Sequence, residues 1–191
     1  IDKDTVYVSQ TAPEGARLPF WKGEIRGRTL KTSREFGKIL AVLENAHEQG
    51  RLREELAALG MDGPAVINAS GFLERQIQST GGLPDNRTIV VEHFTDHSGC
   101  RQVMVHALLG RRVNGPLSLL LQHMVRNACG FDLGCVDEED GFLLYPYGSQ
   151  AMPEGLLYRL EPGQVRETLE TMLPLTPLFG MAFRYNAARA L

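Results

Sequence analysis

One amphipathic helical pattern, set between two hairpin patterns, constrains the fold of this chain more than any other feature. The helical pattern follows Pro116, a residue that suits the first position of a helix. Its apolar residues recur at helical spacing, at Leu117, Leu120, Leu121, Met124, Val125 and Ala128. Residues 88–94 and 101–108 before it, and residues 131–136 and 142–145 after it, have the composition of paired strands. A sheet made of such hairpins can bury one face against the apolar stripe of the helix.

Apolar periodicity predicts five further helices around this unit. The first has Ser33 as its predicted N-cap. The predicted helices cover residues 32–50, 52–60, 62–80, 163–173 and 177–191. We therefore predict an α+β fold in which an antiparallel sheet built from hairpins has helices packed on one side. Residues 1–31 are predicted to form an N-terminal strand and a basic loop that carries Trp21, and residues 32–191 the α+β part of a single domain.

Composition excludes several classes of protein. The chain has 191 residues, of which 43% are hydrophobic, and a net charge of -3. Three cysteines are too few for a disulfide scaffold, and we expect a reducing, cytoplasmic environment. No apolar run approaches the roughly 18 residues of a membrane span, and no signal-peptide pattern is present. Because the chain begins at Ile1 and ends within a helical pattern, we expect it to be a piece of a longer protein.

The sequence carries no recognisable catalytic motif, so we predict no catalytic residue, metal ligand or cofactor site in it. It lacks the glycine-rich phosphate loop, the dinucleotide fingerprint, the nucleophile elbow and the zinc-protease motif. Cys100, Cys129 and Cys135 lack metal-ligand spacing. A catalytic pair of Cys100 with His106 or His123 stays open at this stage.

A cluster of basic residues surrounds the only tryptophan. Between Arg17 and Lys38 there are seven basic and two acidic residues, a net charge of +5, which leaves -8 for the rest of the chain. Trp21 follows Phe20 and is accompanied by the basic residues Lys22, Arg26 and Arg28. This combination is typical of a platform on which a base stacks beside phosphate contacts. The alternative is that Phe20 and Trp21 fill the core where the loop crosses it.

Two more basic groups are candidates for phosphate contacts. Arg111 and Arg112 precede a helix start, where free backbone N–H groups also attract anions. Arg184, Asn186 and Arg189 lie on the last predicted helix. For each group the alternative is a salt bridge to a carboxylate of this chain or of a neighbouring domain. The acidic run 137–140 is predicted to be a solvated hairpin turn.

Four stretches, taken in order, resemble the DEAD/H-associated region of Lhr-type (large helicase-related) ATP-dependent helicases. They are Pro19-Phe20-Trp21-Lys22-Gly23-Glu24 with Gly27-Arg28, then residues 83–92, residues 110–117 and residues 183–191. Asp140-Gly141 falls where the family has an acidic turn. The sequence departs from the family mainly at residues 97–100 and 173–177.

This resemblance implies an accessory domain of a superfamily 2 helicase that moves 3′ to 5′ on DNA. Such proteins carry two RecA-like motor domains and a winged-helix domain before this region, and use ATP with Mg²⁺ in the motor. The implied partners are single-stranded DNA or an RNA:DNA hybrid and the chain's own RecA-like and winged-helix domains, with no membrane. Trp21 becomes a stacking candidate, while Arg111, Arg112, Arg184 and Arg189 become candidates for phosphate or interdomain contacts. The alternative function is structural packing without nucleic-acid contact.

Overall fold

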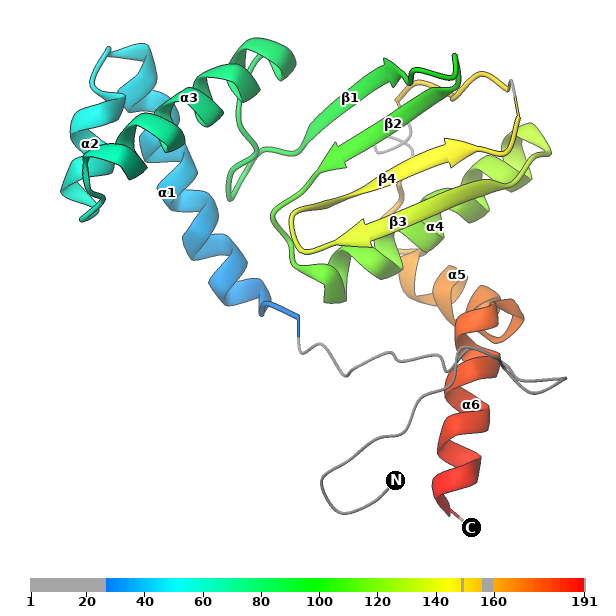
Figure 1. Ribbon diagram of the computed structural model, residues 1–191. Coiled ribbons are helices and arrows are strands. Elements are labelled where there is room, and N and C mark those ends of the chain that lie inside the picture. The colour runs from blue at the N-terminus through cyan, green and yellow to red at the C-terminus, as the bar shows by residue number, and fades with distance from the viewer. Residues whose placement is uncertain (1–26, 149, 156–159, 191) are drawn as a thin grey trace, which may run out of the picture.

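The computed structural model describes residues 27–148, 150–155 and 160–190. Three helices come first, and a four-stranded sheet with one long helix follows (Figure 1). The first part contains α1 (Leu30–Glu48), α2 (Leu52–Ala58) and α3 (Gly63–Thr80). The second contains β1 (Val90–Thr95), β2 (Arg101–His106), α4 (Arg111–Cys129), β3 (Leu133–Glu138) and β4 (Gly141–Pro146). The last elements are α5 (Val165–Met172), the short 3-10 helix η2 (Leu173–Leu175) and α6 (Pro177–Ala190).

The sheet has the strand order β1-β2-β4-β3, and every neighbouring pair is antiparallel. Both predicted hairpins are present, β1–β2 and β3–β4, and they join where β2 pairs with β4. The register aligns Val105 with Phe142 and Val103 with Leu144, so side chains of the two central strands share one face. The α+β prediction, with an antiparallel sheet of hairpins, is confirmed.

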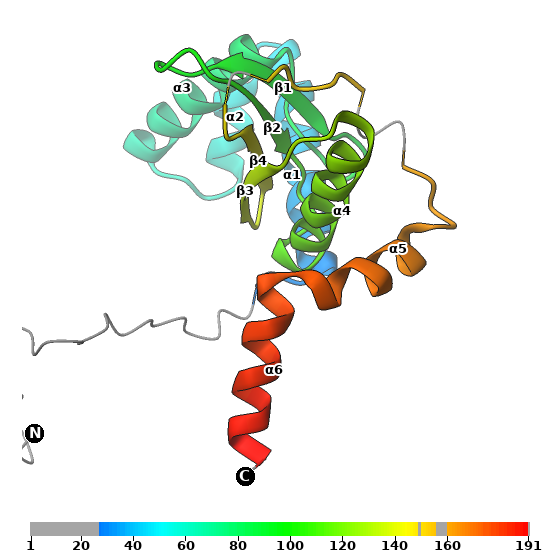
Figure 2. The ribbon, with the colours of Figure 1, turned by 90° about the vertical axis from the view of Figure 1, so that its right-hand side faces the viewer.

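The α4 helix covers one face of the sheet, and α5 packs against α4 (Figure 2). Leu121 and Val125 of α4 are buried against Phe142 and Leu144 of β4. The neighbouring side chains of β2 belong to the same cluster. The predicted apolar stripe is therefore the stripe that forms the core. Side chains on the opposite face of the sheet are more exposed, and Val136 of β3 is an example.

The first three helices have a separate apolar cluster. Leu43 of α1, Leu52 and Leu56 of α2, and Val66 of α3 are buried together. Leu83, which follows α3, closes this cluster. None of the helices in the described ranges has the length and apolar character needed to cross a membrane.

Two predicted helix starts are wrong, one because of a local cap and the other because of long-range contacts. α1 begins at Leu30, because the Thr29 hydroxyl accepts a hydrogen bond from the N–H of Thr32 (3.2 Å). Ser33, the predicted cap, is instead buried inside the first turn. α4 begins at Arg111 and contains Pro116 within it, so the helix extends one turn further than its proline indicated. The side-chain contacts of that extra turn are described below.

The predicted strand at residues 5–9 and the Trp21 loop lie outside the described residues.

The two faces of β4 provide a stability test. We expect Leu144→Ala to lower the free energy of unfolding by about 2–5 kcal/mol, because Leu144 is fully buried against α4. Leu143→Ala removes the same atoms from the neighbouring, half-buried position on the opposite face, and we expect a clearly smaller loss. Urea unfolding of the two variants measures the difference. Equal losses would show that the sheet does not bury the face assigned here.

Candidate nucleic-acid interface

Three segments that resemble the helicase family meet at the turn of the β3–β4 hairpin. We call this region the hairpin-turn junction, and it comprises residues 27–33, 107–114 and 137–141. The backbone alone ties two of the segments together, since the N–H of Gly110 donates to the Glu139 carbonyl (3.1 Å) and the N–H of Ala107 to the Asp140 carbonyl (2.9 Å). The relative position of these motifs therefore depends on the geometry of one turn.

The carboxylate of Glu139 is the centre of the junction. Its Oε2 accepts a hydrogen bond from the backbone N–H of Arg28 (2.9 Å) and another from the backbone N–H of Arg111 (3.2 Å). The second of these N–H groups belongs to the first residue of α4 and has no partner within its helix. The sequence predicted an anion at this helix N-terminus, and a carboxylate of the same chain lies there.

The Arg28 guanidinium holds the same turn from the other side. Its Nη2 pairs with the Asp140 carboxylate and donates to the Glu139 carbonyl (3.3 Å). Its Nε donates to the hydroxyl of the buried Ser33 (3.0 Å), and its plane lies over the Phe36 ring at 5.2 Å. Only 24% of the side chain is exposed. Arg28 thus has partners within the chain at both Nε and Nη2.

Arg111 is also paired. Its Nε donates to Asp137 Oδ2 (2.9 Å), and this hydrogen bond, with the charge of the same carboxylate, raises the pKa of Arg111. Asp137 and Glu139 are therefore less solvated than the predicted turn implied. Arg112 is exposed, and within the described residues no carboxylate lies within ion-pair distance of it.

Asn114 is a structural residue of the junction whose role the sequence did not reveal. It is fully buried, and its Nδ2 donates to the carbonyls of Ala107 (3.0 Å), Glu138 (3.0 Å) and Glu139 (3.2 Å). These bonds hold the turn of α4 that precedes Pro116. The Asn-Gly-Pro sequence indicates only a turn, and it does not show that the Asn114 amide bonds to carbonyls elsewhere in the chain. Among the described residues, its Oδ1 has no hydrogen-bond partner.

The junction is too tight for a side chain at Gly110. Its φ of 79° and ψ of 152° lie in a region that essentially only glycine adopts. A Cβ built there would lie 2.7 Å from the Arg28 carbonyl oxygen and 3.2 Å from the Ser33 hydroxyl. The chain at residue 28 and the start of α4 are therefore in direct backbone contact.

The stretch 83–92 forms a second ordered turn, against α1. Asp85 Oδ1 accepts hydrogen bonds from the backbone N–H groups of Arg87 and Thr88, both at 2.6 Å. Burial by itself would raise the pKa of Asp85, but these hydrogen bonds outweigh it and the pKa is lowered. A Cβ on Gly37 would lie 2.5 Å from the Asn86 nitrogen, so this turn packs directly on the helix that leaves the junction.

The remaining predicted residues lie apart from this turn. Arg184, Asn186 and Arg189 are exposed on α6, where the Arg189 guanidinium lies over the Tyr185 ring at 5.4 Å. Figure 2 shows α6 extending away from the body of the domain. Within the described ranges, no hydrogen bond or ion pair joins α6 to the junction. Trp21, Lys22 and Arg26 lie outside the described residues.

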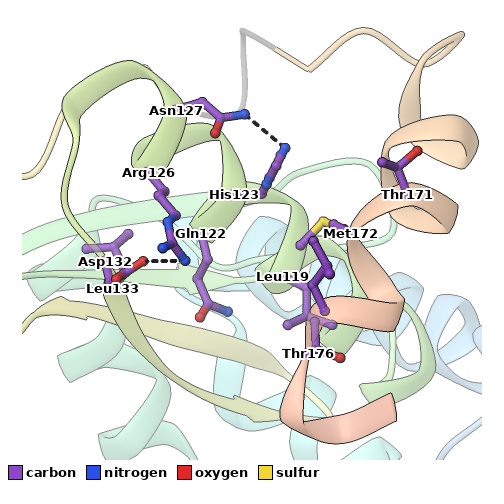
Figure 3. Close-up of a pocket in the computed structure, with 11 residues that line it drawn as sticks. Leu119, Gln122, His123, Arg126, Asn127, Asp132, Leu133, Thr171, Met172 and Thr176 are labelled. Carbon is purple, nitrogen blue, oxygen red and sulfur yellow. Dashed lines mark hydrogen bonds and ion pairs between the residues drawn. The ribbon is translucent and has the colours of Figure 1, made fainter. Parts of the chain in front are cut away.

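A pocket of about 560 Å³ opens on the other side of α4, between this helix and α5 with η2 (Figure 3). Four of its polar side chains pair with one another, since Asn127 Nδ2 bonds to His123 Nε2 (2.9 Å) and Arg126 pairs with Asp132 (3.3 Å). In the part of the chain that the structure describes, no three His, Cys, Asp or Glu side chains come together to hold a metal ion. None of the predicted strand-contacting residues lines this pocket.

Comparison with known proteins identifies the family. The model of the DEAD/H associated family matches residues 83–191, more than half of the chain. The chain belongs to the DEAD/H associated family. This result confirms the resemblance inferred from the four sequence stretches. The family match includes two of the three junction segments, residues 107–114 and 137–141.

The relatives of this DEAD/H associated chain are Lhr helicases. It is 30% identical to the Lhr helicase/uracil glycosylase of Escherichia coli over its whole length. It is also 30% identical to the Lhr helicase/probable uracil glycosylase of Mycolicibacterium smegmatis. It spans only 12% and 13% of the lengths of these two proteins.

A solved structure is also similar. The structure of Mycobacterium smegmatis helicase Lhr bound to ssDNA and AMP-PNP matches 92% of this DEAD/H associated chain, with 31% identity and a TM-score of 0.71. The match takes in 22% of that helicase chain. The described fold is thus similar to one part of that much larger helicase chain.

Two glycines compare an open left-handed position with the crowded junction. We expect Gly130→Ala, at a φ of 76° in open space, to lower the free energy of unfolding by about 1–2 kcal/mol. Gly110→Ala combines a backbone conformation that is less favourable for alanine with a contact at 2.7 Å to the Arg28 carbonyl, so we expect a further loss of about 1–3 kcal/mol from the two effects together. Thermal or urea unfolding measures both variants. A loss at Gly110 no larger than that at Gly130 would contradict the close approach in the junction.

Proposed function

We propose that this chain is the accessory domain of an ATP-dependent superfamily 2 helicase and that it contacts the single strand during unwinding. The observation that carries the proposal is the match, over nearly the whole chain, to a helicase structure that holds single-stranded DNA. The relatives with full coverage of this chain are helicases as well. The motor would lie in other parts of the protein, with ATP and Mg²⁺ bound there, since this sequence has no phosphate-binding loop.

Chain connectivity supports a strand-contacting surface at the hairpin-turn junction. Trp21 is six residues before Gly27, so even an extended chain separates their Cα atoms by at most roughly 20 Å. Lys22 and Arg26 are closer still. These residues and the exposed Arg112 therefore form the first candidate group, with Trp21 stacking on a base and the cations contacting phosphates.

The other predicted residues have different parts in the proposal. Arg28 and Arg111 already bind carboxylates, so a phosphate contact by either would require exchange of a partner. Arg184, Asn186 and Arg189 form a second candidate group on α6. An RNA:DNA hybrid as substrate, 3′ to 5′ movement and a cytoplasmic location belong to the same proposal.

Interdomain packing is the second candidate function, and α6 favours it. Phe183 and Tyr185 of this helix are 63% and 57% exposed. A helix that carries apolar residues on all sides is typically buried in a larger protein. The chain's own RecA-like and winged-helix domains are the proposed partners of this surface.

Replacement of Trp21 tests the strand contact. In the complete helicase, we expect Trp21→Ala to weaken single-strand binding by about five- to 150-fold, since base–aromatic stacking contributes roughly 1–3 kcal/mol per base. Unwinding per ATP hydrolysed should fall with it. Fluorescence anisotropy with a labelled oligonucleotide at fixed salt measures affinity. Tyr147→Ala, at a described aromatic that is 75% exposed, is the control and should have little effect. Unchanged affinity and unwinding in Trp21→Ala would favour the packing function.

Arg112 provides a separate electrostatic test. A phosphate contact releases condensed counterions, so Arg112→Gln should make the slope of log affinity against log salt shallower by about 0.7. Arg126→Gln is the matched control, because Arg126 is an exposed cation on the same helix that already pairs with Asp132. The same salt titration is run on both variants. Identical slopes for Arg112→Gln and the unsubstituted protein would remove Arg112 from the strand-contacting group.

A further inference from the structure

We infer that Asp137 limits the affinity of this domain for a single strand, because it keeps Arg111 out of the strand contact and leaves Arg112 as the phosphate contact at the start of α4. The inference rests on the proposed function and names the residue that sets how tightly this turn holds a phosphate. Asp137 itself is not proposed to touch the strand.

The pair of Asp137 and Arg111 joins two regular elements. Asp137 lies on the face of β3 that α4 covers, as do Leu133 and Cys135. Arg111 is the first residue of α4, and its Nε donates to Asp137 Oδ2 at 2.9 Å. A Cβ on Gly115, one helical turn further along, would lie 3.4 Å from the same oxygen. The carboxylate therefore lies against the start of α4, where it meets the Arg111 side chain.

The carboxylate cancels the charge that a phosphate would otherwise meet at Arg111. An ion pair at hydrogen-bond distance presents a dipole, and no net charge, to a more distant anion. Asp137 is the main cause of the raised pKa of Arg111, and the charges of Glu138 and Glu139 add to it. A phosphate that approaches Arg111 must therefore displace a carboxylate. At the exposed Arg112, no carboxylate of the described residues lies within ion-pair distance.

Arg28, the other paired cation of the junction, is held by more partners. Ser33 accepts from its Nε, and both the Asp140 carboxylate and the Glu139 carbonyl bind its Nη2. Within the described residues, the Arg111 guanidinium makes one hydrogen bond. The exposed fraction of the side chain is 36% for Arg111 and 24% for Arg28. Loss of a single carboxylate would therefore release the charge of Arg111, but not that of Arg28.

A limit on phosphate contacts suits a protein that moves along its strand. Each phosphate contact adds affinity and salt dependence without regard to base sequence. A translocating protein has to release every contact in turn, and a second full cation at the same turn would slow that release. Asp137 thus holds the number of phosphate contacts at this turn to the one made by Arg112.

Salt titration of strand binding by the complete helicase tests this inference. Asp137→Asn keeps an acceptor oxygen but removes the charge, and it should fold, since partly exposed ion pairs contribute little to stability. We expect it to make the slope of log affinity against log salt steeper by about 0.7 and to strengthen binding about threefold at low salt, because one more phosphate is contacted. Asp132→Asn is the matched control, since it releases Arg126 at the other end of α4 and should change neither quantity. Equal gains in the two variants would overturn the inference.

Substitution of Arg111 separates release of this cation from a general change in the local field. In the Asp137→Asn background, Arg111→Gln should abolish the gain in affinity. In the otherwise unsubstituted protein, Arg111→Gln should leave the salt slope unchanged, because that charge is already withheld from the strand. A gain that survives Arg111→Gln contradicts the inference. So does a shallower slope for Arg111→Gln alone, an outcome that requires no variant of Asp137.

The Arg112→Gln titration distinguishes failure of this inference from failure of the strand contact. If Arg112→Gln makes the slope shallower while Asp137→Asn leaves it unchanged, the strand contact stands and the limiting role of Asp137 is wrong. If Arg112→Gln leaves the slope unchanged, the phosphate contact at this turn is wrong, and the role of Asp137 falls with it.

Discussion

The carboxylate at the start of α4 is the interaction on which the arrangement of this domain depends. Burial of the α4 stripe on β2 and β4 brings the first turn of the helix to the β3–β4 turn. The N–H groups of that first turn need acceptors, because a helix cannot satisfy them internally. Glu139 accepts one of them and, through the same oxygen, the N–H of Arg28. The chain that enters α1 is thereby attached to the sheet by the same group that caps the helix.

Two apolar clusters make this attachment necessary. The cluster of α1–α3 and the cluster of the sheet and α4 have no residue in common. Hydrophobic burial is non-directional and stabilises each cluster separately. The polar contacts of Arg28 with Asp140, Glu139 and Ser33 are directional, so they define how α1 leaves the sheet. A second contact, where Gly37 meets Asn86, fixes the return of the chain toward β1.

The helices and strands could be predicted from the sequence, but the contacts of the hairpin-turn junction could not. Strand alternation and the α4 stripe depend on neighbouring residues, so both hairpins and the helix could be predicted correctly. The start of α4 could not, since the Arg111 N–H and the Asn114 amide gain their acceptors on the β3–β4 turn only after the hairpin has formed. The acidic run was predicted as a solvated turn for the same reason. Its partners, Arg28 and Arg111, are distant in sequence.

Local charge is an incomplete guide to a binding surface for the same physical reason. The basic segment between Arg17 and Lys38 carries a net charge of +5, yet Arg28 within it is paired with Asp140. Arg111, in a separate basic group, is paired with Asp137. Such partly buried pairs remove both charges from the field that a distant phosphate experiences. The guanidinium groups then act as structural links, and only cations without a nearby carboxylate are free to attract an external anion. A net charge of -3 therefore does not by itself decide where the chain attracts anions, because the position of each charge and its partners matter more than the sum.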